Sequence, residues 1–185
     1  MKEHFSPFPV METERLILRE ITFEDAEQLF SILSDSRVAE YDYFYPIKSK
    51  DEVLNFIKRY RKELEGGEEI TWGIISKTTN KLIGTCCLGD FNEKTKRAEI
   101  GYAFLQAEWG KGYATEAARA IVAFGFKVMD LNRIEALITP GNDASVKVVK
   151  KLNFVQEGLL RQRDFIKGKL EDGIMMAILK KDYIG

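Results

Sequence analysis

The chain has few of the residues on which several large classes of protein depend. Its 185 residues include two cysteines and one histidine, too few for a disulfide scaffold or for a zinc site with the usual cysteine and histidine spacing. Cys86 and Cys87 are neighbours in a strand-like segment, so they would point to opposite faces of a sheet as reduced structural thiols. His4 lies in a segment without periodicity and is not expected to act as a catalytic base. We therefore predict that the protein holds no metal.

Long apolar runs and an excess of one charge are also missing. No apolar stretch reaches the length of about 18 residues that a transmembrane helix requires, and residues 1–10 lack the regions of a signal peptide. The formal net charge is −1, which argues against a nucleic-acid partner because such proteins usually carry a basic face. A hydrophobic content of 45% suits one domain over residues 1–185. We expect a cytoplasmic protein that binds neither nucleic acid nor membrane.

Hydrophobic periodicity predicts strands that alternate with helices. A strand over Leu16–Glu20 leads to a helix that begins after Thr22. A second helix begins at the capping box Ser49-x-x-Glu52 and ends at the two glycines at 66–67. The N-terminal part therefore supplies one strand and two helices.

The rest of the chain continues this alternation. Turn-forming residues separate three strands of a meander, and a helix, a strand, a short helix and two closing strands follow. These elements are expected over residues 71–76, 82–90, 97–104, 114–128, 133–139, 144–152, 155–164 and 170–179. This order predicts an α/β fold. Its mixed central sheet has six to seven strands, antiparallel at first and parallel at the 97–139 crossover, with about four flanking helices.

The junction at Gly110-Lys111-Gly112 says most about function. A strand pattern ends before it, and a helical stripe of apolar residues begins after it. No Ser, Thr, Asp or Asn stands where this helix would take its N-cap, so the N–H groups from Lys111 to Ala114 have no capping side chain. Glycine lets an anion approach this backbone closely, and the positive end of the helix dipole attracts it. The junction therefore predicts a phosphate-binding loop.

Other phosphate loops fit this junction poorly. A Walker A loop needs several residues between its first glycine and Gly-Lys-Ser/Thr, whereas Lys111 alone separates Gly110 from Gly112. The dinucleotide fingerprint finds Thr115 in the place of its third glycine, and Asp130 is a weak acidic partner for it. A turn that is rich in glycine for steric reasons is the simplest alternative.

Two further segments accompany the glycine junction. Residues 13–19 read Thr-Glu-Arg-Leu-Ile-Leu-Arg, and residues 142–145 read Asn-Asp-Ala-Ser ahead of Lys-Leu-Asn-Phe at 151–154. With the junction, which is similar to a pyrophosphate loop of the form Gln/Arg-x-x-Gly-x-Gly/Ala, they resemble the GNAT superfamily of acetyl-CoA-dependent N-acetyltransferases. The likeness is to its subgroup of ribosomal-protein alanine and serine N-terminal acetyltransferases. It covers about residues 11–181 and implies the GNAT fold.

The resemblance implies which residues bind acetyl-CoA. The backbone of the junction would hold the pyrophosphate, Asn142 would bind the pantetheine arm, and the Ser145 hydroxyl would donate a hydrogen bond to the sulfur. In GNAT folds the strand at 99–104 splays from its neighbour at 133–139, so free N–H groups near Phe104 and Leu105 would bind the pantetheine and the acetyl oxygen. The junction residues assigned to acetyl-CoA are Gly110, Lys111, Gly112, Tyr113, Ala114 and Thr115.

The short helix at 144–152 has a distinct inward face. On a helical wheel Ser145 shares this face with apolar residues, and three lysines lie on the other side. The apolar residues are Val148, Val149 and Leu152, and the lysines are Lys147, Lys150 and Lys151. A serine near a helix start is otherwise most often a cap or a spacer, and Asn142 and Asp143 are equally placed for the cap. The lysines form a solvated face, unless one of them reaches the 3′-phosphate.

Three positions depart from the family pattern. Ala107 takes the Gln/Arg place of the loop, with Gln106 one residue early, so the backbone contacts are expected and a side-chain contact from this place is not. Asn153 replaces the usual glycine, a mild change because Asn also tolerates positive φ. Val149 stands where many members carry the tyrosine that protonates the leaving thiolate, so any acid must be another residue. A non-catalytic acetyl-CoA sensor is therefore kept as an alternative to an enzyme.

Glu99 is the candidate general base, at the start of the strand expected to splay. The family often has a carboxylate there that acts directly or through water. An ordinary charge at a strand end is the alternative, and Asp90 and Glu40 are lesser candidates. An N-terminal α-amine, with a pKa of about 7.7 to 8.0, needs a weaker base than a lysine amine at about 10.4. Glu99 and Ser145 are thus the two catalytic candidates.

The acceptor side is assigned to residues 40–46, Glu-Tyr-Asp-Tyr-Phe-Tyr-Pro. This segment resembles the family's acceptor loop, and Tyr43 and Phe44 are its candidate substrate residues. Acids and tyrosine hydroxyls suit a cationic amine, while plain aromatic packing explains the cluster equally well. We expect acetyl-CoA and a primary amine as partners, the amine being an N-terminal α-amine of a protein such as a ribosomal protein. A polyamine, an amino acid or an aminoglycoside stays open as acceptor, and the protein is expected to be a monomer or homodimer.

Overall fold

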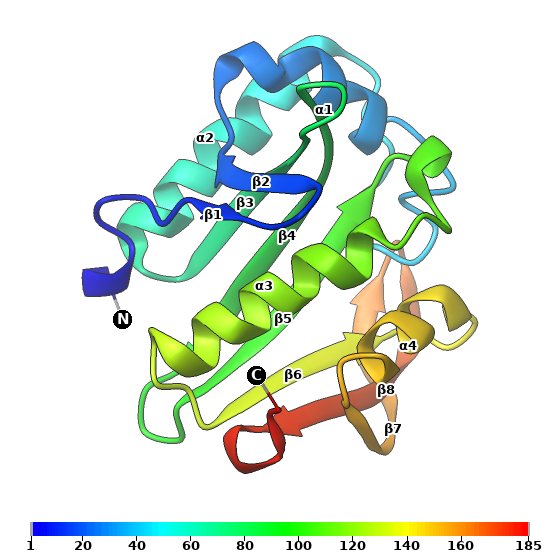
Figure 1. Cartoon of the computed structure of the whole chain (residues 1–185). Helices are drawn as coiled ribbons and strands as arrows, with labels where there is room; N and C mark the ends of the chain where they lie inside the picture. The colour runs from blue at the N-terminus through cyan, green and yellow to red at the C-terminus, as the bar shows by residue number, and fades with distance from the viewer. Residues whose placement is uncertain (1, 185) are drawn as a thin grey trace.

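The computed structural model describes residues 2–184, and one mixed sheet with helices on both faces forms its centre (Figure 1). Eight strands lie in the order β1-β2-β3-β4-β5-β6-β8-β7. All neighbouring pairs are antiparallel except β5 and β6, which are parallel. The strands are β1 (Met11–Glu12), β2 (Leu16–Glu20), β3 (Glu69–Ser76), β4 (Lys81–Asn92), β5 (Arg97–Phe104), β6 (Arg133–Ile138), β7 (Val155–Ile166) and β8 (Lys169–Leu179).

The sheet has one strand more than the six to seven that were predicted. The extra strand is β1, a two-residue segment in which Met11 pairs with Leu18 of β2. Two residues are too few to show an alternating pattern, so the sequence carried no signal for this strand. The α/β class, the antiparallel meander and the parallel crossover are confirmed.

The predicted four helices are present within residues 2–184. They are α1 (Ala26–Leu33), α2 (Lys50–Gly66), α3 (Tyr113–Lys127) and α4 (Asp143–Lys150). Four short 3-10 segments accompany them: η1 (Lys2–His4), η2 (Phe23–Asp25), η3 (Gln106–Glu108) and η4 (Lys180–Asp182). No helix in this part of the chain combines the length and the apolar character needed to cross a membrane.

Local signals set the ends of the helices. The capping box of Ser49 and Glu52 opens α2, and Gly67, with φ of 74°, ends it as predicted. The first helix begins later than expected, because Thr22 caps the short η2 segment and α1 follows from Ala26. The reason lies in Asp25, whose carboxylate turns back to accept a hydrogen bond from the Thr22 N–H at 2.9 Å and so tightens the first turn.

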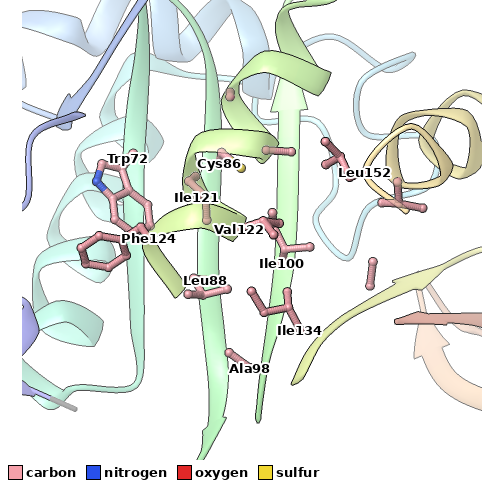
Figure 2. Close-up of a cluster of buried hydrophobic side chains, with 14 of the residues drawn as sticks. Trp72, Cys86, Leu88, Ala98, Ile100, Ile121, Val122, Phe124, Ile134 and Leu152 are labelled. Atoms are coloured by element: carbon pink, nitrogen blue, oxygen red, sulfur yellow. The ribbon is translucent and has the colours of Figure 1, made fainter. Parts of the chain in front are cut away.

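Helix α3 packs across the middle of the sheet and forms the larger core (Figure 2). The ring of Phe124 meets that of Trp72 edge to face, with centroids 5.5 Å apart. A Cβ at Gly125 would come within 2.8 Å of the Ile134 side chain, so the helix approaches β6 this closely because residue 125 has no side chain. A second core, around Leu29 and Ile57, lies between α1, α2 and the opposite face. The sheet is therefore covered on both faces.

Strands β5 and β6 part after three residue pairs (Figure 1). Their parallel pairing ends at Glu99 and Glu135. Beyond this point β5 stays with β4 as far as Phe104, and β6 stays with β8 as far as Ile138. The sheet therefore opens between the C-terminal halves of β5 and β6, and α4 lies beside the open end.

The hairpin of β7 and β8 reaches a distant part of the chain. Lys167, in its turn, donates hydrogen bonds to the carbonyls of Ala39 and Glu40. Tyr41 in turn lies against Gly141, because a Cβ at Gly141 would come within 3.4 Å of the tyrosine hydroxyl. The loop between α1 and α2 is thus held by segments from the C-terminal half of the chain.

Candidate active site

The opening in the sheet leads into a cavity of about 630 Å³. Residues from Glu99 to Ala103 on β5 line it together with residues from Ala136 to Ile138 on β6. The start of α4 contributes Asn142 and Ser145, and residues 41–44 and helix α2 contribute aromatic side chains. The cavity therefore brings the residues assigned to the thioester together with those assigned to the acceptor.

The glycine junction has the backbone that a phosphate loop requires. Gly110 and Gly112 have φ of 75° and 83°, values that favour glycine because other residues carry a Cβ that clashes there. Gly112 is the N-cap of α3, and no side chain caps the helix, as predicted. Within residues 2–184, no protein acceptor takes the N–H groups of residues 111–115. The junction thus presents free donors at the positive end of the helix dipole.

Arg15 supports this junction from the bend between β1 and β2. Its guanidinium donates to the Lys111 carbonyl at 2.9 Å and lies over the Tyr113 ring, 4.5 Å from the centroid. Glu116 receives the Arg15 backbone N–H and side chain and the Thr13 hydroxyl. Burial works to raise the pKa of Glu116, but hydrogen bonds from Thr13 and Arg15 outweigh it, so the pKa is lowered. The segment at 13–19, noted for its family resemblance, therefore braces the loop.

One of the two N–H groups assigned to the splayed strand is engaged elsewhere. Leu105 donates its N–H to the Ile83 carbonyl at 2.9 Å, so the prediction that this donor is free is wrong. The ladder with β4 continues to this position, and its alternation turns the N–H groups of Tyr102 and Phe104 toward β6 instead. The Phe104 carbonyl accepts from the Trp109 indole at 2.8 Å. Phe104 is therefore the better placed of the two assigned residues.

The start of α4 is fixed at two points. Asn142 is the N-cap, because its side-chain oxygen accepts the Ser145 N–H at 3.2 Å, which leaves its amide NH₂ for a ligand. The Tyr102 hydroxyl donates to the Ser145 carbonyl, also at 3.2 Å. Ser145 lines the cavity, whereas Lys147 and Lys150 are exposed, as the helical wheel predicts. The backbone of Ser145 is therefore held beside β5 by its own N–H and carbonyl.

Glu99 lies half-buried in the cavity wall, directly where β5 and β6 part. Burial raises its pKa to about 7, and the nearby charges of Asp90 and Glu135 add to the effect. Within residues 2–184, Glu99 makes no ion pair. Glu135, its neighbour across the sheet, differs, because Arg97 and Arg133 both contact it, at 2.8 and 2.6 Å. Glu99 thus has the protonation properties of a base that works near neutral pH.

The two lesser candidates for the base lie in different surroundings. Asp90 lines the cavity, in a bulge where its φ is 47°, but it is paired with Arg97 at 2.9 Å. Glu40 is exposed and does not line the cavity. His4 lies in η1, outside the cavity lining. Glu99 is therefore the carboxylate that best fits the role.

Both predicted substrate residues line the cavity. Phe44 packs edge to face on Phe56, with centroids 5.9 Å apart, so it belongs to the packed wall. Tyr43 is 57% exposed, and burial of its hydroxyl end and the charge of Asp164 raise its pKa to about 12. Asp42 accepts the Tyr43 N–H at 2.7 Å, and burial raises the pKa of this carboxyl. The predicted acceptor side therefore combines aromatic rings with a carboxylate.

The cavity residues that the sequence analysis did not assign to the site include Glu69, Cys87, Tyr102 and Arg163. Glu69 and Cys87 reach the cavity through the register of β3 and β4, which no local pattern reports. The alternation of β5 was the available signal for Tyr102, which lies between Gly101 and Ala103. Within the part of the chain that the structure describes, no group of three or more possible metal ligands is assembled.

Comparisons with known proteins agree on one family. The sequence pattern of the acetyltransferase (GNAT) domain matches residues 15–155. The chain is 38% identical over 173 residues to an uncharacterised N-acetyltransferase of Bacillus licheniformis, covering 94% of this chain and 97% of that protein. It is 25% identical over 167 residues to spermidine N(1)-acetyltransferase of Escherichia coli strain K12, covering 90% and 87%. A structure from Vibrio cholerae, described as a proposed ribosomal-protein-serine acetyltransferase, superposes with a TM-score of 0.84 at 25% identity, covering 94% and 98%.

Proposed function

Because the chain belongs to the GNAT family of acetyl-CoA-dependent N-acetyltransferases, we propose that it acetylates a primary amine by direct attack in a ternary complex, with Glu99 as general base. The single observation that carries this proposal is the position of Glu99. Its carboxylate lines the cavity at the point where β5 and β6 part. It is there that an amine and a thioester would meet.

The reaction asks little of the protein beyond placement and proton transfer. The amine nitrogen forms a bond to the thioester carbonyl carbon, the carbon–sulfur bond breaks, and the nitrogen loses a proton while the thiolate gains one. A thiol with a pKa of about 8.5 is a fair leaving group. The site must therefore hold the two partners in line, stabilise the oxyanion and accept the proton of the amine.

Glu99 suits the proton of an α-amine. Its pKa of about 7 leaves the carboxylate mostly ionised at slightly alkaline pH. An N-terminal ammonium has a pKa of about 7.7 to 8.0, so the transfer to Glu99 is close to balanced, whereas a lysine ammonium at about 10.4 would oppose it. This match supports a protein N-terminus, such as that of a ribosomal protein, as the acceptor.

Backbone and side-chain donors are available to bind acetyl-CoA. The free N–H groups of residues 111–115 suit a pyrophosphate. Asn142 lines the cavity with its amide NH₂ outside the cap, and the N–H of Phe104 lies on the β6 side of its strand, so both suit pantetheine and the acetyl oxygen. The Ser145 hydroxyl is the proposed donor to the leaving sulfur, since Val149 offers none. These assignments come from the family resemblance, and the available donors support them.

A small cationic amine is the second candidate acceptor. Asp42, Asp90 and Glu99 all line the cavity, and carboxylates favour a substrate with positive charge. The identity with a spermidine acetyltransferase is consistent with this alternative. Both candidates share the same chemistry and the same base, and differ in what binds beside the reacting nitrogen.

Thiol release tests the proposal directly. Acetyl-CoA is mixed with the protein, and free thiol is followed as alanine- and serine-starting peptides, polyamines, amino acids and aminoglycosides are added. We expect release with one class of amine, loss of most of it in Glu99→Gln, and retained acetyl-CoA binding in that variant by calorimetry. Release that is unchanged in Glu99→Gln would overturn the assignment of the base. Absence of release with every amine would overturn the proposed transfer.

A further inference from the structure

Two carboxylates without cationic partners lie in one row across the sheet. The register pairs Glu69 of β3 with Gly89 of β4, and Gly89 with Glu99 of β5. Residues in one row point to the same face, and neighbouring strands are about 4.8 Å apart, which places the backbones of Glu69 and Glu99 about 10 Å apart. All three residues line the cavity. Glu69 and the proposed base, Glu99, therefore lie on the same face of the sheet, which forms the floor of the cavity.

The side chain of Glu69 has a defined orientation over this floor. The Thr71 hydroxyl donates to its Oε1 at 2.9 Å. A Cβ at Gly89 would lie 2.9 Å from both the Cγ and the Oε2 of Glu69. The carboxylate thus leans from β3 across Gly89, with one oxygen held by Thr71 and the other above the glycine. The missing side chain at position 89 makes room for this arrangement, on the side of Glu69 that faces Glu99.

The charges around Glu69 leave its carboxylate without a counterion. Two guanidiniums line the cavity, and each has an acidic partner: Arg59 lies 3.5 Å from Glu63, and Arg163 lies 2.8 Å from Asp164. Within residues 2–184, neither Glu69 nor Glu99 makes an ion pair. Asp42, a third cavity carboxylate, likewise accepts only a backbone N–H.

The position and freedom of this carboxylate define a role in choosing the acceptor. We propose that Glu69 is a specificity-determining residue that binds a second cationic group of the acceptor while the reacting amine lies at Glu99. The substrate class is then an amine with two positive charges, either a polyamine or a peptide whose N-terminus is followed by a basic residue. This inference rests on the proposed function, because it assigns the reacting amine to Glu99.

Diamines and monoamines of matched length measure how much the second charge of the acceptor contributes to the rate. Initial rates of thiol release are measured for a series of α,ω-diamines and for alkyl monoamines of the same chain lengths. We expect the unmutated protein to prefer the best diamine over its monoamine by about tenfold to a hundredfold in kcat/KM, the range for a charge-assisted contact. In Glu69→Gln this preference should fall to within about threefold. The preference should also weaken as salt is raised.

Two further variants test position and charge separately. Gly89→Ala keeps the charge of Glu69 but places a methyl group where its carboxylate lies, so we expect the diamine preference to fall as in Glu69→Gln. Glu68→Gln removes the adjacent exposed charge, which does not line the cavity, and should leave the preference unchanged. Circular dichroism and melting curves check that each variant is folded.

The outcomes separate this inference from the proposed function. Thiol release with no preference for a second charge, or a preference that survives in Glu69→Gln, would overturn the role of Glu69 and leave the transferase intact. No release with any amine would instead remove the proposed function. Parallel assays with polyamines and with alanine-starting peptides, with and without lysine at the second position, identify which source of the second charge the site accepts.

Discussion

The hydroxyl of Tyr102 donates a hydrogen bond to the Ser145 carbonyl, 3.2 Å away. Tyr102 belongs to β5 and Ser145 to the first turn of α4, so this bond joins the two elements beside the point where β5 and β6 have separated. Asn142 holds the same turn from within the helix. The position of Ser145 therefore depends on a side chain from the strand as well as on its own helix.

Replacing Tyr102 with phenylalanine should loosen this turn. The ring still fills its place in the cavity wall, but the loss of one partly buried hydrogen bond should cost about 1 kcal/mol of unfolding free energy. We expect the KM for acetyl-CoA to rise several-fold, measured in steady-state assays beside urea denaturation. Tyr45→Phe is the matched control, since Tyr45 is 66% exposed and outside the cavity lining. Equal kinetics in the two variants would contradict the role given to Tyr102.

The pH dependence of the rate should report Glu99. Its pKa of about 7 predicts that kcat/KM rises with pH through neutrality, because the base must be ionised to accept a proton. In Glu99→Gln the rate should fall by about 10² to 10³-fold and lose this limb of the profile. Profiles recorded with a peptide of known α-amine pKa separate the titration of the enzyme from that of the substrate.

The raised pKa of Glu99 also predicts that this residue destabilises the folded protein at the higher pH at which it acts as a base. Glu99 has a folded pKa of about 7 against an ordinary value of 4.5, so between these values the folded protein binds more protons than the unfolded chain. Its contribution to stability therefore falls as pH rises from 4.5 to 7. Glu99→Gln should be more stable than the unmutated protein at pH 8, by about 1 to 3 kcal/mol. Denaturant curves at pH 5 and pH 8 measure this crossover, and a less stable variant at pH 8 would refute it.

A side chain at Gly112 should harm acetyl-CoA binding. The φ of 83° at Gly112 strains any residue with a Cβ by about 1 to 2 kcal/mol, and the added methyl group would lie 3.4 Å from the Arg15 guanidinium that braces the loop. We expect Gly112→Ala to raise the KM for acetyl-CoA about tenfold or more. S-acetylpantetheine, which lacks the pyrophosphate, serves as the matched substrate, and its KM should change much less. Equal losses with both would point to general damage.

Replacing Lys167 should weaken binding of the amine and leave binding of acetyl-CoA nearly unchanged. Its ammonium holds the carbonyls of Ala39 and Glu40, next to the loop that carries Tyr43 and Phe44. We expect Lys167→Met to raise the KM of the amine about three- to tenfold, with the KM for acetyl-CoA within about twofold. Lys169→Met, an exposed lysine two residues on, controls for the loss of charge. A change confined to acetyl-CoA would contradict this assignment.

Elements with strong local signals were predictable from sequence. The strand over Arg97–Phe104 and the capped start of α2 lie where periodicity and the capping box place them. The uncapped glycine junction also followed from local residue types. In contrast, β1 is too short for a pattern, and the start of α1 depends on how Asp25 folds back. Local residue patterns therefore predict long periodic segments better than short ones.

Features that depend on strand pairing were beyond the sequence. The N–H of Leu105 is engaged because β4 continues alongside it, a fact of register. Glu69 reaches the cavity because three strands align it with Gly89 and Glu99. No local pattern carries this information, since cross-strand neighbours can be far apart in the chain. The roles of Glu99 and Ser145 in catalysis stay predictions, although both side chains line the cavity.

The bond from Lys167 to Ala39 spans 128 positions of the chain, which has a consequence for biosynthesis. The proposed acceptor loop leaves the ribosome long before the hairpin that holds it, since chains emerge from the N-terminus. The phosphate loop and its brace at Arg15, by contrast, are both complete once α3 has been made. The contact that holds residues 39 and 40 can therefore form only after the β7–β8 hairpin has been made, so this side of the cavity should be completed after the brace at Arg15.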